Sequence, residues 1–213
     1  MMNLTIDKFQ RLQAIASIET EEVEKASRLV QVLLDKSSDE IEEMNIKEFN
    51  ALCEKLKAVF DMKVDEATMA KPKSVIKANG KRYHINYEIK KPFNTGRYIE
   101  VLTFSKDDPI MNMHNILASI CTPMVWSWKK LRYIKGEYDV LKHEDYADDL
   151  KQADFKHGYH AMVFFYLLLM NLTGDSSLYL EDKLREMMIE DRKITALKNT
   201  FRTISGGSIM QNR

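Results

Sequence analysis

Apolar residues recur at helical spacing through the first part of the chain. This pattern predicts amphipathic helices over residues 5–17 and 20–34, each with charged residues opposite its apolar face. Ser37 and Asn45 are each followed three residues later by Glu, the spacing of a capping box, which predicts two further helix starts. Such short helices are unstable alone, so we expect residues 1–61 to share one core.

The pattern changes to that of strands in residues 74–89. Here Asn79-Gly80 separates two stretches rich in Val, Ile and Tyr, and this dipeptide supplies the two positive φ angles of a type I′ turn. In the second stretch apolar and polar residues alternate, as in a strand with one buried face. Because a lone hairpin is marginally stable, we expect it to pack on helices or pair with another strand.

Helical and extended patterns alternate after the hairpin. Residues 95–104 fit either a third strand or a short helix, and we favour the helix. Pro109 follows two aspartates and marks a helix start, and we expect that helix to run to Pro123. Residues 124–140 are aromatic and β-rich, which predicts a strand pair or an extended excursion.

The last part of the chain is again helical in pattern. Residues 143–153 predict a polar helix, and residues 159–172 predict the most apolar helix of the chain, which we expect at the centre of a second core. Residues 178–201 predict a long final helix. We expect the segment 204–213 beyond it to be mobile.

Together these patterns predict an α+β fold, mainly α-helical, with a central β-hairpin and at most one further short strand pair. Only 7 glycines and 4 prolines among 213 residues agree with a high helix content. The expected organisation is a helical N-terminal unit at 1–61, a connector at 62–73 that ends in Lys-Pro-Lys, the hairpin and helical core at 74–203, and the tail at 204–213.

Charge is unevenly distributed although the formal net charge is +0. Residues 1–61 carry 8 Lys and Arg against 13 Asp and Glu, a balance of −5, whereas residues 62–106 carry 10 against 4, a balance of +6. Opposite charge in adjoining segments favours either packing of one on the other or head-to-tail association between copies.

Several classes of protein fit the sequence poorly. The longest apolar run, residues 161–170, is shorter than the roughly 20 residues that span a bilayer, so we expect no membrane span. The N-terminus lacks the pattern of a secretory signal. Cys53 and Cys121 are far apart, and we expect both to be buried thiols inside helices, in a reducing compartment.

No motif points to catalysis, a metal or a cofactor. His157 and His160 are three residues apart, but no third or fourth ligand accompanies them, so capping or core roles are favoured over a metal site. No glycine-rich phosphate loop or nucleophile elbow is present. We expect His114 to be packed in the core and His143 to lie on a polar face. The acidic group Asp145, Asp148 and Asp149 is interpreted as a solvated helix face.

Two groups of residues are candidates for an interaction surface. The basic stretch 71–97, which includes Lys81, Arg82, Lys90 and Lys91, is interleaved with aromatic residues and could bind nucleic acid, although lysines also protect exposed strand edges.

Trp126 and Trp128 form the second candidate, and they precede two lysines. Tryptophans two apart share one face of a strand, so they either pack on the core or form a tip that binds a partner or a membrane interface.

The central stretch resembles small proteins encoded among the tail genes of tailed bacteriophages. Four motifs over about residues 75–170 carry the resemblance: the turn Asn79-Gly80-Lys81-Arg82-Tyr83; Tyr98-Ile99-Glu100 with Phe104; the helix segment 114–121 (HNILASIC) ahead of Pro123; and Phe164-Phe165. The resemblance implies a non-enzymatic tail assembly or structural adaptor protein, with tail assembly chaperones as the nearest class, and it implies no catalytic residues. Its partners would be other tail or virion proteins or further copies of the chain, in the host cytoplasm during assembly or in the virion. A nucleic-acid-binding regulator that uses the hairpin at 71–97 is the alternative.

Overall fold

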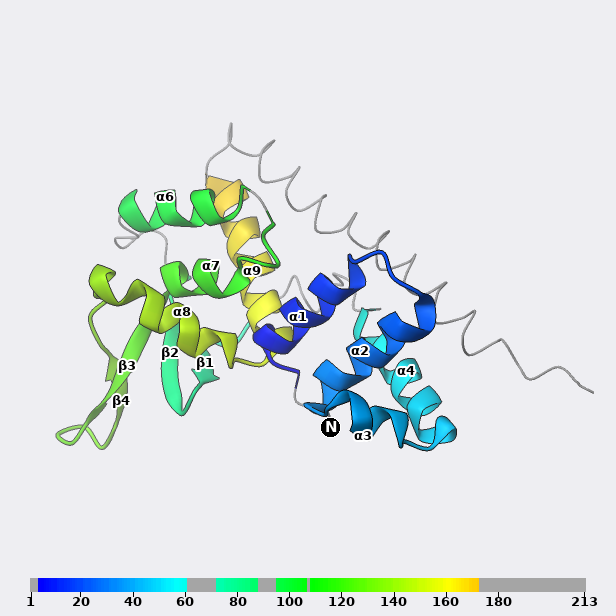
Figure 1. Cartoon of the computed structure of the whole chain (residues 1–213). Coiled ribbons are helices and arrows are strands. Elements are labelled where there is room, and N and C mark those ends of the chain that lie inside the picture. The colour runs from blue at the N-terminus through cyan, green and yellow to red at the C-terminus, as the bar shows by residue number, and fades with distance from the viewer. Residues whose placement is uncertain (1–3, 61–71, 88–94, 107, 173–213) are drawn as a thin grey trace, which may run out of the picture. The chain divides into compact units, whose positions relative to one another are not determined.

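A computed structural model describes residues 4–60, 72–87, 95–106 and 108–172 (Figure 1). The protein has an α+β fold, as predicted. Its described residues belong to two compact units: residues 8–60 form one, called here the helical unit, and all the others form the second, called here the sheet unit. The predicted final helix and tail, and most of the predicted connector, lie outside the described residues.

The helical unit contains the elements that the apolar pattern predicted. They are α1 (Ile6–Ala16), whose first two residues belong to the sheet unit, α2 (Glu22–Leu34), α3 (Ser38–Glu42) and α4 (Ile46–Phe60). Helix α2 contacts both α3 and α4. Leu29 in α2 and Leu56 in α4 are fully buried, so these two helices, which contact each other, bury apolar residues that each would expose alone. Leu12 in α1 is also fully buried.

Both predicted helix starts have side-chain caps. The Ser37 hydroxyl accepts a hydrogen bond from the Glu40 backbone N–H at 3.3 Å, and the Glu40 carboxylate accepts one from the Ser37 N–H at 2.9 Å. This is the reciprocal capping box. At the start of α4 the Asn45 side-chain oxygen accepts a hydrogen bond from the Lys47 N–H at 2.8 Å. The caps satisfy N–H groups that have no partner within the helix.

The sheet unit is built on one antiparallel sheet with strand order β1-β2-β3-β4. The strands are β1 (Val75–Ala78), β2 (Lys81–Ile85), β3 (Cys121–Ser127) and β4 (Arg132–Lys135). The first turn has φ angles of 47° at Asn79 and 72° at Gly80, which confirms the predicted hairpin. The strand pair predicted within 124–140 is also present, and β2 joins the two hairpins by pairing with β3.

Four α-helices and one short 3-10 helix accompany the sheet. They are α6 (Thr95–Phe104), α7 (Met113–Ile120), η1 (Val140–Lys142), α8 (His143–Lys151) and α9 (Phe155–Leu172). The favoured helix at 95–104 is therefore confirmed, as is the apolar helix near 159–172. Helix α7 contacts α6, α8 and α9, and Ile116 and Leu117 in it are fully buried. The core of this unit is thus centred on α7.

The predicted bounds of α7 are wrong at both ends. The Asp108 carboxylate accepts hydrogen bonds from the N–H groups of Ile110 and Met111, so a local turn precedes the helix. At the other end the chain passes directly into β3 at Cys121, which is therefore a strand residue and not a helix residue. Pro123 lies inside β3. A proline disfavours the helical conformation in the residue before it, so the helix ends ahead of Thr122.

The first described residues of the chain pair with the corner between α8 and α9. The Ile6 N–H donates to the Ala153 carbonyl at 3.0 Å, and the Phe155 N–H donates to the Leu4 carbonyl at 2.8 Å. Thr5 between them forms an isolated β-bridge with Asp154. The N-terminal segment is therefore an integral part of the sheet unit.

Gly158 in α9 permits a close approach at the same corner. A β-carbon at this position would lie 2.7 Å from Cδ1 of Ile6 and 3.0 Å from Cδ1 of Leu117. Both distances are shorter than carbon–carbon van der Waals contact. The absence of a side chain at Gly158 therefore lets α9 pack against the N-terminal segment and α7.

Candidate interaction surface

Lys81, one of the predicted surface residues, is held in an ion pair. Its ammonium lies 2.6 Å from the carboxylate of Asp149 in α8, which also accepts hydrogen bonds from the Asn79 amide at 2.7 Å and from the Tyr83 hydroxyl. Asp149 is only 4% exposed. The interpretation of this aspartate as part of a solvated face was wrong, whereas Asp148 beside it is exposed.

The three donors explain the ionisation of Asp149. Burial raises the pKa of this carboxyl group, but the hydrogen bonds from Lys81, Tyr83 and Asn79 favour the carboxylate more strongly, so the net pKa is lowered. The carboxylate therefore ties the turn of the first hairpin to α8.

Arg82 is also engaged within the sheet unit. Its guanidinium carbon lies 4.3 Å from the centroid of the Tyr133 ring in β4, a cation–π contact across β3. Lys90 and Lys91, the other two basic residues of the predicted surface, lie outside the described residues. Lys81 and Arg82, the two described candidates on the first hairpin, therefore both have partners within the sheet unit.

The two tryptophans lie on the second hairpin, and both are exposed. Trp126 in β3 is 42% exposed, and its ring packs edge-on against Tyr133 at 5.2 Å between centroids. Trp128 lies in the turn after β3 and is 82% exposed. In Figure 1 this hairpin projects away from the helices of the sheet unit. Trp128 is therefore presented to solvent and does not pack in a core.

The residues around Trp128 form a surface that is both apolar and basic. We call residues 128–132 the hairpin tip; they are Trp128, Lys129, Lys130, Leu131 and Arg132. Leu131 is 72% exposed, and no ion pair among the described residues involves the three basic side chains. The sequence has no acidic residue between Asp108 and Glu137, so the tip carries positive charge without local neutralisation.

The backbone of the hairpin tip is ordered by its own hydrogen bonds. The Lys130 N–H donates to the Ser127 carbonyl at 3.2 Å, and Leu131 has a left-handed φ of 47°. At the base of the hairpin the Gly136 N–H donates to the Pro123 carbonyl at 2.9 Å. Sequence reasoning did not select Leu131, although an apolar residue flanked by basic residues in a short loop was a visible signal.

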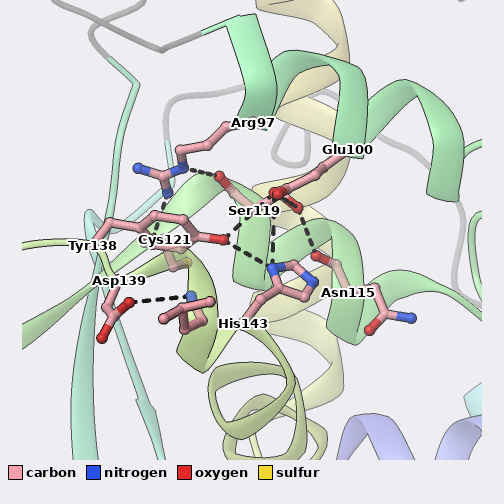
Figure 2. A network of polar contacts seen from close by, with 9 residues as sticks. Arg97, Glu100, Asn115, Ser119, Cys121, Tyr138, Asp139 and His143 are labelled. Carbon is pink, nitrogen blue, oxygen red and sulfur yellow. Dashed lines mark hydrogen bonds and ion pairs between the residues drawn. The ribbon is translucent and has the colours of Figure 1, made fainter.

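A second polar cluster lies inside the sheet unit, around Arg97 (Figure 2). Arg97 is 7% exposed and donates hydrogen bonds of 2.5 Å to the carbonyls of Ser119 and Cys121. Its guanidinium also stacks 4.0 Å from the centroid of the Tyr138 ring. The last carbonyl groups of a helix have no hydrogen-bond donor within the helix. The Arg97 cation supplies donors to the carbonyls at the C-terminal end of α7, where the chain continues into β3.

Glu100 connects this cluster to His143. Its carboxylate accepts a hydrogen bond from the Ser119 hydroxyl at 3.1 Å and lies 3.8 Å from Nδ1 of His143, which is 2.8 Å from the Tyr138 hydroxyl. Figure 2 shows these side chains converging from separate elements. Ser119 is completely buried, and the cluster links α6 to the end of α7, to the start of β3 and to His143 in α8.

His143 does not lie on a polar face as predicted. Its ring stacks on Phe104, with 5.5 Å between centroids and 9° between planes. Burial lowers the pKa of His143 despite the opposing effect of Glu100. The histidine is therefore neutral at neutral pH and packs as an aromatic ring.

His157 and the two cysteines have ordinary local surroundings. His157 Nε2 is 3.4 Å from the Lys73 carbonyl, and within residues that the structure describes no group of three His, Cys, Asp or Glu side chains could hold a metal. Both cysteines are buried, and burial raises the pKa of Cys53 to about 11 and that of Cys121 to about 12. Both thiols are therefore protonated at neutral pH.

Four of the six predicted surface residues are described. Lys81 is exposed but ion-paired with Asp149, Arg82 is half-buried against Tyr133, and both tryptophans are exposed. Across the described ranges, no helix has the length and apolar character needed to cross a membrane. No family model matches the chain, and no curated protein or solved structure is significantly similar to it.

Proposed function

We propose that this protein is a non-enzymatic adaptor or assembly protein of a bacteriophage tail and that it binds other proteins through the hairpin tip. The observation that carries the proposal is the 82% exposure of Trp128 at the end of an ordered hairpin. The resemblance of the central stretch to tail-module proteins supplies the class of partner, namely other tail or virion proteins met in the host cytoplasm during assembly.

The energetics of the hairpin tip support binding. Tryptophan and arginine are the side chains most enriched among residues that dominate protein interfaces. Burial of the exposed Trp128 in a complex removes a large apolar area from water. This stabilises the complex by about 25 cal/mol for each Å² of apolar surface buried. The hairpin is already held by strand pairing and by the turn at Ser127, so little conformational entropy is lost on binding.

Two of the three described basic residues of the first hairpin favour nucleic-acid binding less than their sequence suggested; the third, Lys77, is exposed. Lys81 is neutralised by Asp149, and Arg82 stacks on Tyr133. Non-specific binding to nucleic acid depends on cations that can pair with phosphates. This argues against the first hairpin as a nucleic-acid site. The hairpin tip has three cations of its own, and the test below separates a protein partner from nucleic acid.

The experiment is a pull-down with purified products of the neighbouring tail genes, at low and at physiological salt. We expect a complex with at least one tail protein and a loss of at least tenfold in affinity for Trp128→Ala. Leu141→Ala is the matched control, because Leu141 is 95% exposed but lies outside the hairpin. Absence of any complex at both salt concentrations, or salt-dependent binding to DNA or RNA in its place, would overturn the proposal.

A further inference from the structure

The hairpin tip requires a particular kind of partner surface. It exposes two large apolar side chains, Trp128 and Leu131, among three cations that no described acidic side chain neutralises. A complementary surface exposes apolar side chains among unpaired carboxylates. Like charges or a purely apolar surface would leave the cations of the tip desolvated without a counter-charge.

The helical unit contains such a surface between α1 and α2. We call residues 18–23 the acidic corner; it comprises Ile18, Glu19, Thr20, Glu21, Glu22 and Val23. Ile18 is 44% exposed and Val23 is 66% exposed. The three glutamates are exposed and form no ion pair with a described residue, whereas the next glutamate, Glu24, is paired with Arg28 at 2.6 Å.

The two surfaces match in charge and in apolar content. The hairpin tip combines two exposed apolar side chains with three cations, and the acidic corner combines two exposed apolar side chains with three carboxylates. No basic residue lies between Arg11 and Lys25, so the corner is not neutralised by its own sequence neighbours.

We propose that the hairpin tip of one copy docks on the acidic corner of a second copy. The proposal rests on the function proposed above, in which the tip binds proteins, and it names one occupant of that site. Each copy carries both surfaces, so the contact is heterologous and repeats from copy to copy, closing into a ring or extending as a filament. Docking of another tail protein on the tip competes with this contact.

The test is the association state of the full chain by sedimentation velocity at low and high salt. We expect association at low salt that high salt weakens, because exposed charge pairs are screened. The two tryptophans of the chain both lie on the second hairpin, so their fluorescence reports on it. Their emission should shift to shorter wavelength as association buries Trp128.

Charge reversal separates the two surfaces. Lys129→Glu with Lys130→Glu reverses the tip, and Glu21→Lys with Glu22→Lys reverses the corner. We expect each variant alone to be monomeric. An equimolar mixture should associate again, because the reversed tip of the first variant meets the reversed corner of the second, and the unchanged corner of the first meets the unchanged tip of the second. Lys135→Glu is the control, since this exposed lysine lies in β4 outside the tip. Circular dichroism of each variant checks that it folds.

Three results would overturn the inference: a wild-type monomer at all concentrations and low salt, association that both charge reversals leave unchanged, or tip variants that lose only binding to anionic lipid vesicles. The outcomes also separate the two proposals. A monomer that still captures a tail protein through Trp128 overturns the self-association and leaves the proposed function intact. Charge-dependent association without any tail-protein complex overturns the proposed function and supports the self-association.

Discussion

Asp149 in α8 forms a 2.6 Å ion pair with Lys81, the first residue of β2. The Asp149 side chain is 6% exposed, while the Lys81 side chain is 61% exposed, so the pair lies at the edge of the core with the acid inside. The same carboxylate holds the Asn79 amide and the Tyr83 hydroxyl. One buried acid thus fixes the first hairpin to a helix far away in sequence.

Asp149→Asn should destabilise the protein by about 2–4 kcal/mol. The amide cannot accept the same three hydrogen bonds, and it leaves buried donors without a charged partner. The measurement is urea unfolding followed by circular dichroism. Asp148→Asn is the matched control: it removes an exposed ion pair with Lys151 and should change the free energy of unfolding by less than about 0.5 kcal/mol. Equal effects of the two substitutions would contradict the anchoring role of Asp149.

Arg97→Lys should destabilise the junction between α7 and β3 by about 2 kcal/mol although it keeps the charge. A guanidinium can donate to the carbonyls of Ser119 and Cys121 at once, whereas an ammonium on a flexible chain cannot match that fork. Arg82→Lys, at a part-exposed ring contact, should cost less than about 1 kcal/mol. Thermal unfolding of both variants compares them. A neutral effect at Arg97 would mean that the buried charge alone holds the junction.

Gly158→Ala should destabilise the sheet unit by about 1–3 kcal/mol, although alanine is the better helix former. The added methyl group would lie 2.7 Å from Cδ1 of Ile6. Ile6→Val removes that carbon and relieves the clash. The loss in free energy of unfolding for the double variant should therefore be smaller than the sum of the losses for the two single variants. Additive free energies of unfolding would show that the clash lies elsewhere.

Acidification should weaken the fold before the carboxylates titrate. Burial lowers the pKa of His114 from 6.5 to about 4, so the unfolded chain takes up a proton more readily than the folded one. The neutral His114 therefore contributes its full free energy of stabilisation above pH 6.5. This contribution, at most about 3 kcal/mol, is lost as the pH falls towards 4. Unfolding free energies measured across this interval test the prediction.

His114→Gln is the control for that titration. Because glutamine does not titrate, the variant should show a shallower pH dependence between 6.5 and 4. Some slope should remain, since burial also lowers the pKa of His143. An unchanged slope would contradict the assignment to His114.

Trp128→Ala should leave the free energy of unfolding unchanged within about 0.5 kcal/mol, because an exposed side chain contributes little to the core. Ile116→Ala, at a fully buried position in α7, should cost about 2–5 kcal/mol. If Trp128→Ala leaves the fold intact, a loss of binding by this variant can be assigned to the missing indole ring. A large loss of stability at Trp128 would mean that the ring supports the fold.

Local signals in the sequence predicted the elements well. The capping box at Ser37 and the turn at Asn79-Gly80 involve atoms only a few residues apart, so their chemistry is readable from spacing alone. The end of α7 was missed because the conformational effect of Pro123 acts on the residue before it, and because the pairing of β3 with β2 depends on residues distant in sequence.

The candidate site was predictable only in part. Trp126 and Trp128 were selected as candidates from the sequence, and both are exposed, but their exposure depends on where the hairpin ends. Lys81 appeared to be a free surface cation because its partner Asp149 lies 68 positions away. The acid in turn appeared to belong to a polar helix, and only packing reveals that its side chain faces inward.

The pairing of Leu4 and Ile6 with the α8–α9 corner has a consequence for synthesis on the ribosome. The residues made first find their partners only after the chain has been made through Phe155. Helix α2 contacts α3 and α4 within residues 22–60, so these contacts can form in the interval, whereas the pairing of Leu4 and Ile6 must wait. A tag or fusion placed just ahead of Leu4 therefore lies beside a backbone pairing that forms only after most of the chain has been made.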